Sequence, residues 1–460
     1  SGSLRRRSLR QRVASRSCKP VQRAVTATEK FGFCPYFHYL CRVRNYTGMG
    51  LYNTGIAMYD FAIGIAARRN RKAALWKEGR RGIFDRMQQA IAADDRVVWV
   101  HAASLGEFEQ GRPIIEMIRQ RYPDRKILLT FFSPSGYEIR KNYDKADYIF
   151  YLPSDRPANV RRFLDIAHPE AAIIIKYEFW LNYLGELRRR RIPTYLVSSI
   201  FRRDSVFFRF YGGKWRRALS TFERMFVQNE ESRELLAELG YDNAVVAGDT
   251  RFDRVADIAR AAKRIPLIEA FKGESRLFVA GSTWGPDEEI LQQLINRNPS
   301  IRFVIAPHEM DEQRIRRIID NTTGGAIRYT QCNGTGDPGT AQVLILDTVG
   351  LLSSVYGYAS WAYIGGGFGV GIHNTLEAAT FGLPIAFGPK YMKFKEARDM
   401  IALGAARSIS SFEQLDEWFA PLRDNEEERL RVSRLAADYT LSNCGATEMI
   451  VDTVFGQRRR

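Results

Sequence analysis

Short apolar runs alternate with amphipathic stretches along most of the chain. Each run holds about four to seven residues rich in Val, Ile and aromatic side chains. The first series consists of RVVWVHA (96–102), KILLTFF (126–132), DYIFYLP (147–153), AAIIIKY (171–177), PTYLVSS (193–199), RMFVQN (224–229) and NAVVAG (243–248). After a break near 252–275, a second series follows: RLFVAGS (276–282), IRFVIAP (301–307), QVLILD (342–347), WAYIGGG (361–367) and LPIAFG (383–388).

Uninterrupted apolar runs are typical of strands buried on both faces, and strand–helix alternation predicts parallel sheets. We therefore expect an α/β protein with two doubly wound, Rossmann-like domains, over residues 76–256 and 257–440. Domains of this kind bind ligands in a crevice beyond the carboxyl ends of their strands. Residues 441–460 are expected to form a C-terminal helix and a basic tail.

The N-terminal part has a different pattern. Residues 1–48 are basic and Ser-rich without sustained periodicity, and we interpret them as a disordered tail outside the fold. A transit-like segment and a misplaced start site are the alternatives. Residues 49–67 are mostly apolar, would span roughly 28 Å as a helix, and precede the cluster Arg68, Arg69, Arg71 and Lys72.

Asn53 and Asp60 make this a poor membrane-spanning helix. An amphipathic helix packed on the protein surface is one interpretation, and a membrane anchor with a basic flank is the other. We favour a membrane-associated helix over 49–75, anchored or peripheral.

The amino-acid composition shows that the chain is strongly basic. The chain has 460 residues and a formal net charge of +17, which suits nucleic acid, anionic lipid or a phosphorylated substrate. Its five cysteines and five histidines form no CxxC, HExxH or other metal-ligand spacing, and we expect neither a metal nor a cofactor. The odd number of widely spaced cysteines favours a reducing compartment.

The first candidate for chemistry is Glu107, in the stretch VVWVHAASLGEFEQGRP (97–113). Ser104 to Glu107 reads as S-x-x-E, the capping box that begins a helix, and those four residues alone favour a structural cap. However, Glu107 follows a predicted strand at the position where α/β folds place ligands, and Gly106 leaves the backbone accessible.

The second candidate is the glycine-rich stretch GGGFGVGIHNTLEAATFGLPIAFGP (365–389). It does not fit the dinucleotide fingerprint, but its glycines would let the backbone approach a phosphate. Asn374 to Glu377 predicts a helix start whose N–H groups could hold that phosphate. An ordinary turn before a helix is the alternative.

These two stretches, together with IAPHEMDE (305–312) and LDTVG (346–350), resemble the 3-deoxy-D-manno-octulosonic acid (Kdo) transferases of lipopolysaccharide assembly. The resemblance covers about residues 49–450. Further matches are LLTFFSPSGYE (128–138), YLPSDRPANVRRFL (151–164), KYEFWLN (176–182), VQNEES (227–232) and GDTRFD (248–253). The series as a whole is specific, although each motif alone is weak.

The resemblance implies a GT-B glycosyltransferase, with an N-terminal acceptor-binding domain, a C-terminal CMP-sugar-binding domain and the reaction in the cleft between them. It implies transfer of Kdo from CMP-Kdo to a lipid A precursor (lipid IVA), with inversion, at the cytoplasmic face of the bacterial inner membrane. Glu107 would be the catalytic base. The CMP-binding positions would be Pro307, His308, Val349, Gly350, Leu351, Asn374, Thr375, Leu376 and Glu377.

Three positions depart from the family pattern. His308 stands where Arg is common, which predicts weaker donor binding above roughly pH 7. Lys176 stands where many relatives carry a glutamate thought to support the transition state, although Glu178 is retained. Arg251 replaces the usual Lys and could grip a carboxylate or phosphate with two hydrogen bonds, or form a surface ion pair with Asp249 or Asp253.

Two alternatives remain at this point. Another GT-B nucleotide-sugar transferase or a sugar epimerase would share the fold. The segment 199–220 interleaves basic and aromatic residues, which suits a lipid surface bearing phosphates but also single-stranded nucleic acid. Since no RNA- or DNA-binding signature accompanies that segment, we expect no nucleic-acid partner, and a membrane-tethered nucleic-acid binder is the weaker alternative.

Overall fold

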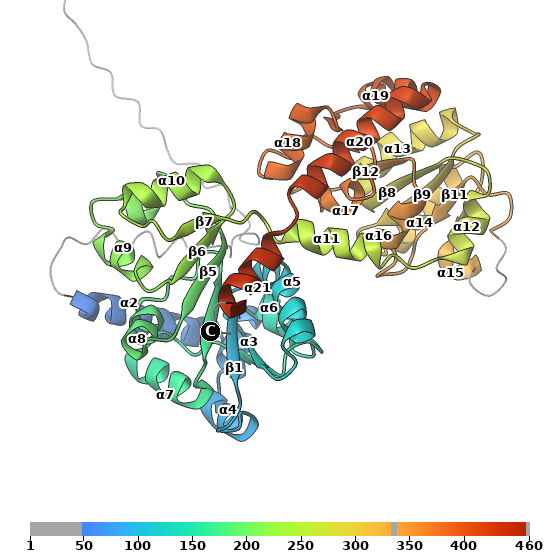
Figure 1. Cartoon of the computed structure of the whole chain (residues 1–460). Helices are drawn as coiled ribbons and strands as arrows, with labels where there is room; N and C mark the ends of the chain where they lie inside the picture. The colour runs from blue at the N-terminus through green and yellow to red at the C-terminus, as the bar shows by residue number, and fades with distance from the viewer. Residues whose placement is uncertain (1–47, 333–337, 457–460) are drawn as a thin grey trace, which may run out of the picture. The chain divides into compact units, whose positions relative to one another are not determined.

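The computed structural model describes residues 48–332 and 338–456 (Figure 1). The predicted tail, apart from residue 48, and the last four residues of the chain lie outside this range. The described part begins with three helices, α2 (Gly48–Ala66), α3 (Arg71–Gly79) and α4 (Ile83–Ala90). Asn70 begins α3 by accepting the Ala73 N–H at 3.1 Å.

The N-terminal sheet has seven parallel strands in the order β3-β2-β1-β4-β5-β6-β7. The strands are β1 (Val97–Ala102), β2 (Lys126–Phe131), β3 (Tyr148–Tyr151), β4 (Ala171–Ile175), β5 (Thr194–Ser199), β6 (Arg224–Val227) and β7 (Ala244–Val246). The connecting elements are α5 (Leu105–Arg121), α6 (Pro134–Arg140), α7 (Pro157–Ala167), α8 (Leu181–Arg190), η1 (Val206–Phe208), α9 (Gly213–Leu219) and α10 (Glu230–Glu238).

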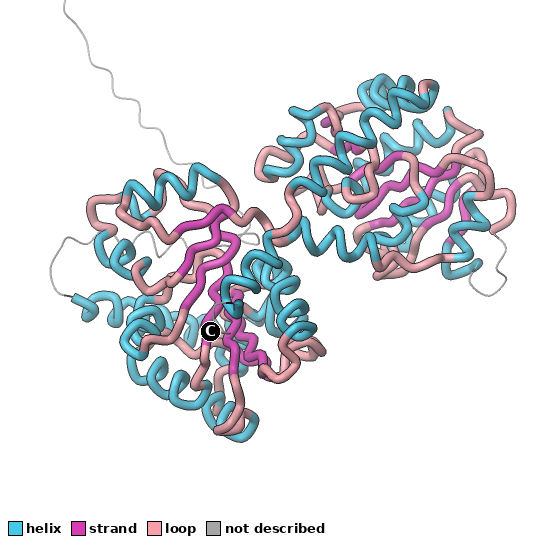
Figure 2. The backbone as a smooth tube through the Cα atoms, viewed as in Figure 1, coloured by secondary structure: helices cyan, strands magenta, loops and turns pink. Residues whose placement is uncertain are grey.

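Helices cover both faces of this sheet (Figure 2), as the alternation within β1 illustrates. Val97 and Trp99 pack in one core cluster, with α4, α7 and α8, while Val98 and Val100 pack in another, with α5. Because both faces are buried, every residue of β1 is buried, and the strand reads as a continuous apolar run.

The C-terminal sheet also has seven parallel strands, in the order β10-β11-β9-β8-β12-β13-β14. The strands are β8 (Leu277–Thr283), β9 (Arg302–Pro307), β10 (Ala326–Arg328), β11 (Val343–Ile345), β12 (Trp361–Ile364), β13 (Ile385–Phe387) and β14 (Ala406–Ser408). Its helices are α12 (Pro266–Lys272), α13 (Gly285–Arg297), α14 (Glu312–Asn321), α15 (Tyr329–Cys332), α16 (Leu352–Val355), η2 (Tyr356–Tyr358), α17 (Leu376–Ala379), α18 (Lys395–Leu403), α19 (Phe412–Asp424) and α20 (Glu426–Ser442). The two predicted doubly wound sheets are thus confirmed.

Two helices connect these sheets along the chain. Helix α11 (Arg251–Arg260) follows β7, and α21 (Ala446–Gly456) follows α20. Apolar residues of α21, among them Ile450, Val451 and Val454, belong to the core cluster of β1, β2 and α5. The last helix therefore completes the N-terminal core, and the domain limits drawn from the sequence remain a prediction.

Helix α2 packs on the N-terminal domain through its polar side chains. Asn53 accepts from Asn182 at 2.8 Å, and Asp60 pairs with Arg156 at 2.7 Å. Its apolar residues Leu51, Met58, Phe61 and Ile65 are 48–71% exposed. Within the described ranges, no helix has both the length and the hydrophobicity needed to cross a bilayer.

Candidate functional site

The carboxyl ends of β1 and β4 lie side by side where the strand order of the N-terminal sheet reverses. In doubly wound folds such a switch point opens a ligand-binding crevice, because the connections on either side run to opposite faces. Glu107 lies in the first turn of α5, after β1, and Lys176 lies directly after β4. Hence the structure brings two of the predicted catalytic residues to this point.

Glu107 is half-buried and only partly serves as a helix cap. Its Oε2 accepts the Ala103 N–H at 2.6 Å, whereas the Ser104 side chain makes no capping bond. The Ser104 half of the predicted reciprocal capping box is therefore absent, and the N–H that Glu107 accepts belongs to Ala103, the residue before the N-cap. Burial, followed by the charge of Glu178, raises the pKa of Glu107 to about 8, although Ala103 N–H and Lys176 lower it. A carboxylate with such a pKa can take a proton near neutral pH.

Lys176 occupies a strained backbone position between charged groups. Its φ of 61° lies in the left-handed region, which is unfavourable for a side chain with a Cβ and is common at functional sites. Burial, together with the charge of Arg251, lowers the pKa of Lys176, while Asp249, Glu107 and Glu396 oppose that shift. The lysine is therefore close enough to both candidate catalytic partners to respond to them.

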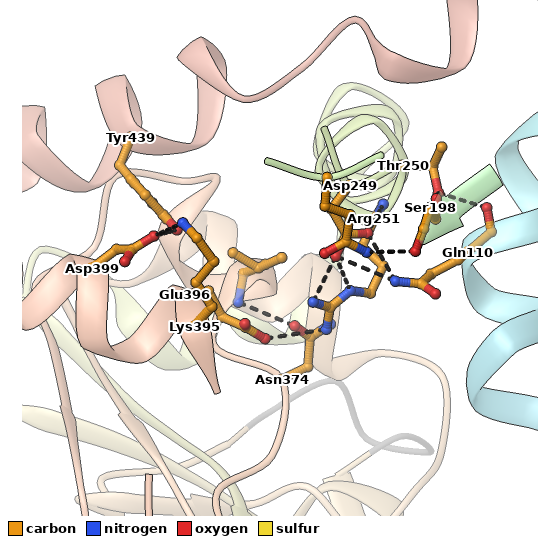
Figure 3. A network of polar contacts seen from close by, with 12 residues as sticks. Gln110, Ser198, Asp249, Thr250, Arg251, Asn374, Lys395, Glu396, Asp399 and Tyr439 are labelled. Carbon is orange, nitrogen blue, oxygen red and sulfur yellow. Dashed lines mark hydrogen bonds and ion pairs between the residues drawn. The ribbon is translucent and has the colours of Figure 1, made fainter. Parts of the chain in front are cut away.

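Arg251, at the start of α11, lies between two carboxylates (Figure 3). Its Nε donates to Asp249 at 2.9 Å, and its Nη1 pairs with Glu396 at 3.1 Å. Burial would lower the pKa of Arg251, but the two acids outweigh it and raise the pKa. Gln110 also donates to Asp249 at 3.2 Å. Of the predicted ion-pair partners Asp249 and Asp253, Asp249 is the one that holds Arg251. Asp253 instead accepts the Gly445 and Thr447 N–H groups.

The candidate CMP-binding residues follow three strands of the C-terminal sheet. Pro307 ends β9 and His308 follows it; Val349, Gly350 and Leu351 lie between β11 and α16; Asn374, Thr375, Leu376 and Glu377 follow β12. Because carboxyl ends of parallel strands share one edge, all nine residues lie along the same edge of the sheet. Val349 is 88% exposed, which leaves an apolar side chain accessible to a ligand.

Three aromatic rings join the loops after β8, β9 and β12. The Trp284 and His308 rings lie 4.8 Å apart, and His308 stacks on His373 at 4.3 Å. Trp284 Nε1–H donates to His373 Nε2 at 3.2 Å, so this nitrogen carries no proton. Burial, then the neighbouring His308, lowers the pKa of His373. This row of rings crosses the switch point between β8 and β12.

The glycines after β12 allow close packing between loops, whereas the approach of a phosphate to their backbone stays a prediction. A Cβ on Gly365 would lie 2.2 Å from the Ser282 carbonyl oxygen, and one on Gly367 would lie 2.5 Å from the Gly388 Cα. Gly366 has a φ of +92° and donates its N–H to the buried Asp287. These positions therefore need glycine even without a ligand.

The helix start predicted at Asn374 also differs in the structure. Thr375 is the N-cap of α17, which has four residues. Asn374 accepts the Leu376 N–H at 3.1 Å and donates to Glu377 at 2.9 Å. Since the helix is so short, a helix-dipole site for phosphate is not supported here, and the side chains would have to bind the ligand. Burial raises the pKa of Glu377.

The fold of this chain is similar to that of several solved structures. A UDP-GlcNAc 2-epimerase from Neisseria meningitidis bound to UDP-GlcNAc matches with a TM-score of 0.56 at 15% identity, over 78% of this chain and 100% of that one. The MurG structure from Acinetobacter baumannii matches with a TM-score of 0.50 at 13% identity, over 78% of this chain and 98% of that one. The chain therefore has the GT-B architecture, as predicted.

Sequence comparison narrows this class. The 3-deoxy-D-manno-octulosonic-acid transferase family profile matches residues 76–254. Transferases of that name from Bordetella pertussis and Haemophilus influenzae are 28% and 25% identical, over 78% and 77% of this chain and 86% of each relative. The chain is therefore similar to the Kdo transferases over most of its length, which confirms the resemblance seen in its motifs.

Several residues of these two sites carry no role in the sequence interpretation. His101 and Glu178 meet beside Glu107, and Trp284 and His373 meet His308. Each comes from a different strand end, so no local spacing links them. For His101, Glu178 and Trp284 the available signal was their position within two residues of a predicted strand's end, where doubly wound folds gather functional side chains. His373 lies six residues beyond its predicted strand and carried no such signal.

Proposed function

We propose that this protein transfers Kdo from CMP-Kdo to the lipid A precursor lipid IVA, with inversion and with Glu107 as the general base. The acceptor hydroxyl oxygen attacks the anomeric carbon of Kdo, and its proton passes to Glu107. The bond from that carbon to the phosphate oxygen breaks, and CMP leaves with its electrons. The observation that carries this proposal is the half-buried Glu107 at a switch point, with a pKa of about 8.

Arg251 and Lys176 are the cationic groups that we assign to this reaction. Developing charge on the departing phosphate is stabilised by positioned cations in a partly buried site. Arg251 is oriented by Asp249 and Glu396, and it can meet a phosphate or the Kdo carboxylate with its planar fork. Lys176 stands at the charge-reversed family position, so we assign it a supporting electrostatic role.

For the donor, we assign CMP to the edge formed by the nine predicted residues. The ring stack Trp284–His308–His373 supports this assignment, because aromatic and imidazole faces stack on nucleobases and a protonated imidazole pairs with phosphate. Asn374 and Glu377 add polar groups suited to ribose or base edges. No step of this reaction calls for a metal.

For the acceptor, we propose that α2 lies on the anionic inner-membrane surface. Its outward apolar stripe Leu51, Met58, Phe61 and Ile65 has helical spacing. The stripe leads to a cavity of about 510 Å³ whose cationic lining is Arg68, Arg71, Lys77 and Arg81. Phe210, 87% exposed in the basic segment 199–220, offers a second contact.

The reaction is tested by incubating the protein with CMP-Kdo and a tetra-acylated lipid A precursor and analysing the lipid by mass spectrometry. We expect the lipid mass to rise by one or more Kdo units. Matched reactions with UDP-GlcNAc and other UDP-sugars form the control arm. Transfer or epimerisation of a UDP-sugar without any Kdo addition would replace this proposal with the GT-B alternative.

A further inference from the structure

One buried carboxylate joins two loops of the C-terminal sheet. Asp287, in the first turn of α13, is 0% exposed. Its Oδ2 accepts the Trp284 N–H at 2.8 Å, directly after β8, and the Gly366 N–H at 3.0 Å, in the loop after β12. Its Oδ1 accepts the Tyr363 hydroxyl at 2.8 Å. Both oxygens are therefore engaged, and a single oxygen atom holds the two loops together.

The backbone of each histidine in the ring stack is attached beside this carboxylate. His308 N–H donates to the Thr283 carbonyl at 2.9 Å, and Thr283 immediately precedes one of the two residues that donate to Asp287 Oδ2. His373 N–H donates to the Gly365 carbonyl at 3.1 Å, and Gly365 immediately precedes the other. The positions of both histidines therefore follow the two loops that Asp287 holds.

The rings of this stack leave little freedom for the loops to move apart. The Trp284 and His308 rings lie 4.8 Å apart at 30°, and the His308 and His373 rings lie 4.3 Å apart at 27°. On the side of the glycine loop, a Cβ on Gly366 would lie 2.9 Å from His373 Cδ2. Since the groups of a binding site must be held to within about 0.5 Å, a small widening between the loops would open the stack.

We propose that Asp287 is a positioning residue for the nucleotide: by holding the loops after β8 and β12 together, it keeps the three rings at the spacing that receives CMP. The inference rests on the proposed CMP site. A fully buried carboxylate is not accessible to the ligand, and its negative charge would oppose a phosphate rather than bind it. Its contribution is therefore the geometry of the loops, while the rings contact the base or the phosphate.

The test separates the position of the oxygen from its charge, by calorimetric titration of CMP into the full chain and into two variants. Asp287→Ala removes both oxygens, and we expect about tenfold weaker CMP binding with an unchanged stoichiometry. Asp287→Asn keeps one oxygen for the two N–H groups, and its amide can donate to the Tyr363 hydroxyl oxygen, so its affinity for CMP should lie within about twofold of the unmodified value. General damage to the fold would lower the stoichiometry instead of the affinity.

Glu289→Ala is the matched control, because Glu289 lies on the same helix two residues further on and is exposed. It should bind CMP as the unmodified protein does. If Asp287→Ala does not fold, as judged by circular dichroism, Asp287→Ser takes its place, since it keeps a polar group at the helix start but is too short to reach both loops. Unchanged CMP affinity in Asp287→Ser would then overturn the inference.

Amide hydrogen exchange without ligand provides a measurement that does not depend on the proposed function. Segments 281–287 and 364–368 should exchange faster in Asp287→Ala than in Glu289→Ala, since two buried N–H groups lose their acceptor. Unchanged exchange, unchanged CMP affinity in Asp287→Ala, or an Asp287→Asn variant as weak as Asp287→Ala would each overturn the inference. An unmodified protein that does not bind CMP would contradict the donor assignment itself, and the exchange result then shows separately whether Asp287 holds the loops.

Discussion

At the carboxyl ends of β1 and β4, two carboxylates and a lysine face one another, whereas at the carboxyl ends of β8, β9 and β12 three aromatic rings meet. Both places are switch points of seven-stranded parallel sheets. In the first, burial and neighbouring charges shift proton affinities. In the second, flat faces and short glycine-rich loops offer a surface on which a nucleotide can lie. We propose that these similar sheets serve two different tasks, proton transfer at the first switch point and nucleotide binding at the second.

The largest effect is expected from Glu107→Gln, which removes the proposed proton acceptor and keeps the shape of the side chain. Turnover should fall at least ~100-fold, since a positioned general base contributes about that much. Donor binding should change little, because the change lies at the first switch point alone. The measurement is the initial rate of Kdo transfer at saturating donor.

Glu109→Gln is the matched control for this comparison. Glu109 lies on the same helix, but it pairs with Arg140 and Arg254, and such partly exposed pairs contribute little. An equal loss in both variants would mean that any acid on α5 matters, and the special role of the switch point would be lost.

A smaller effect is expected at helix α2, which we propose lies on the membrane surface. The double variant Met58→Ser/Phe61→Ser should lower binding to vesicles containing phosphatidylglycerol by about tenfold, because it removes apolar surface available to the lipid. Co-sedimentation with vesicles measures it. Leu441→Ser, on the exposed side of α20 at 61% exposure, is the control and should bind as the unmodified protein does. An equal loss of vesicle binding in both variants would contradict the proposal that α2 binds the membrane surface.

At the second switch point, His308→Asn should raise the donor KM about fivefold, since an aromatic contact is lost. His168→Asn, which changes a ring bonded to the Ala92 carbonyl, should leave the donor KM unchanged. An unchanged donor KM in His308→Asn would mean that this ring makes no contact with the donor.

The smallest effect concerns stability. The folded protein holds the Glu107 proton more tightly than the unfolded chain does, since the pKa is raised from 4.5 to about 8. This contribution is present at low pH and is lost as pH rises toward 8. Glu107→Gln should therefore raise the unfolding temperature by about 2 °C at pH 8.5 and by less at pH 5. A larger gain at pH 5 would contradict the raised pKa.

Most strands could be predicted from the apolar runs, and the strands that were missed have a physical reason. Strands β10 (Ala326–Arg328) and β14 (Ala406–Ser408) were not predicted. Both are three-residue edge strands with a neighbour on one side, and each includes polar or exposed positions. A strand of this kind lacks the continuous apolar run that marks a central strand.

The sites were less predictable than the fold. Glu107 could be placed because its strand-to-helix junction is local in sequence. The contacts of His101 with Glu178 and of His308 with His373 join strand ends 77 and 65 residues apart, and they depend on strand order. Likewise, the residue spacing in α2 predicts its apolar face. It does not predict that Asp60 accepts hydrogen bonds from Ser154 and Arg156, which lie far away in the sequence.

We propose that the N-terminal sheet provides the catalytic base and the C-terminal sheet binds the nucleotide. The most direct test is calorimetric titration of CMP into Glu107→Gln and into His308→Ala. The account predicts that Glu107→Gln binds CMP as the unmodified protein does while lacking transferase activity, and that His308→Ala binds CMP more weakly. Loss of CMP binding in Glu107→Gln with unchanged binding in His308→Ala would contradict it.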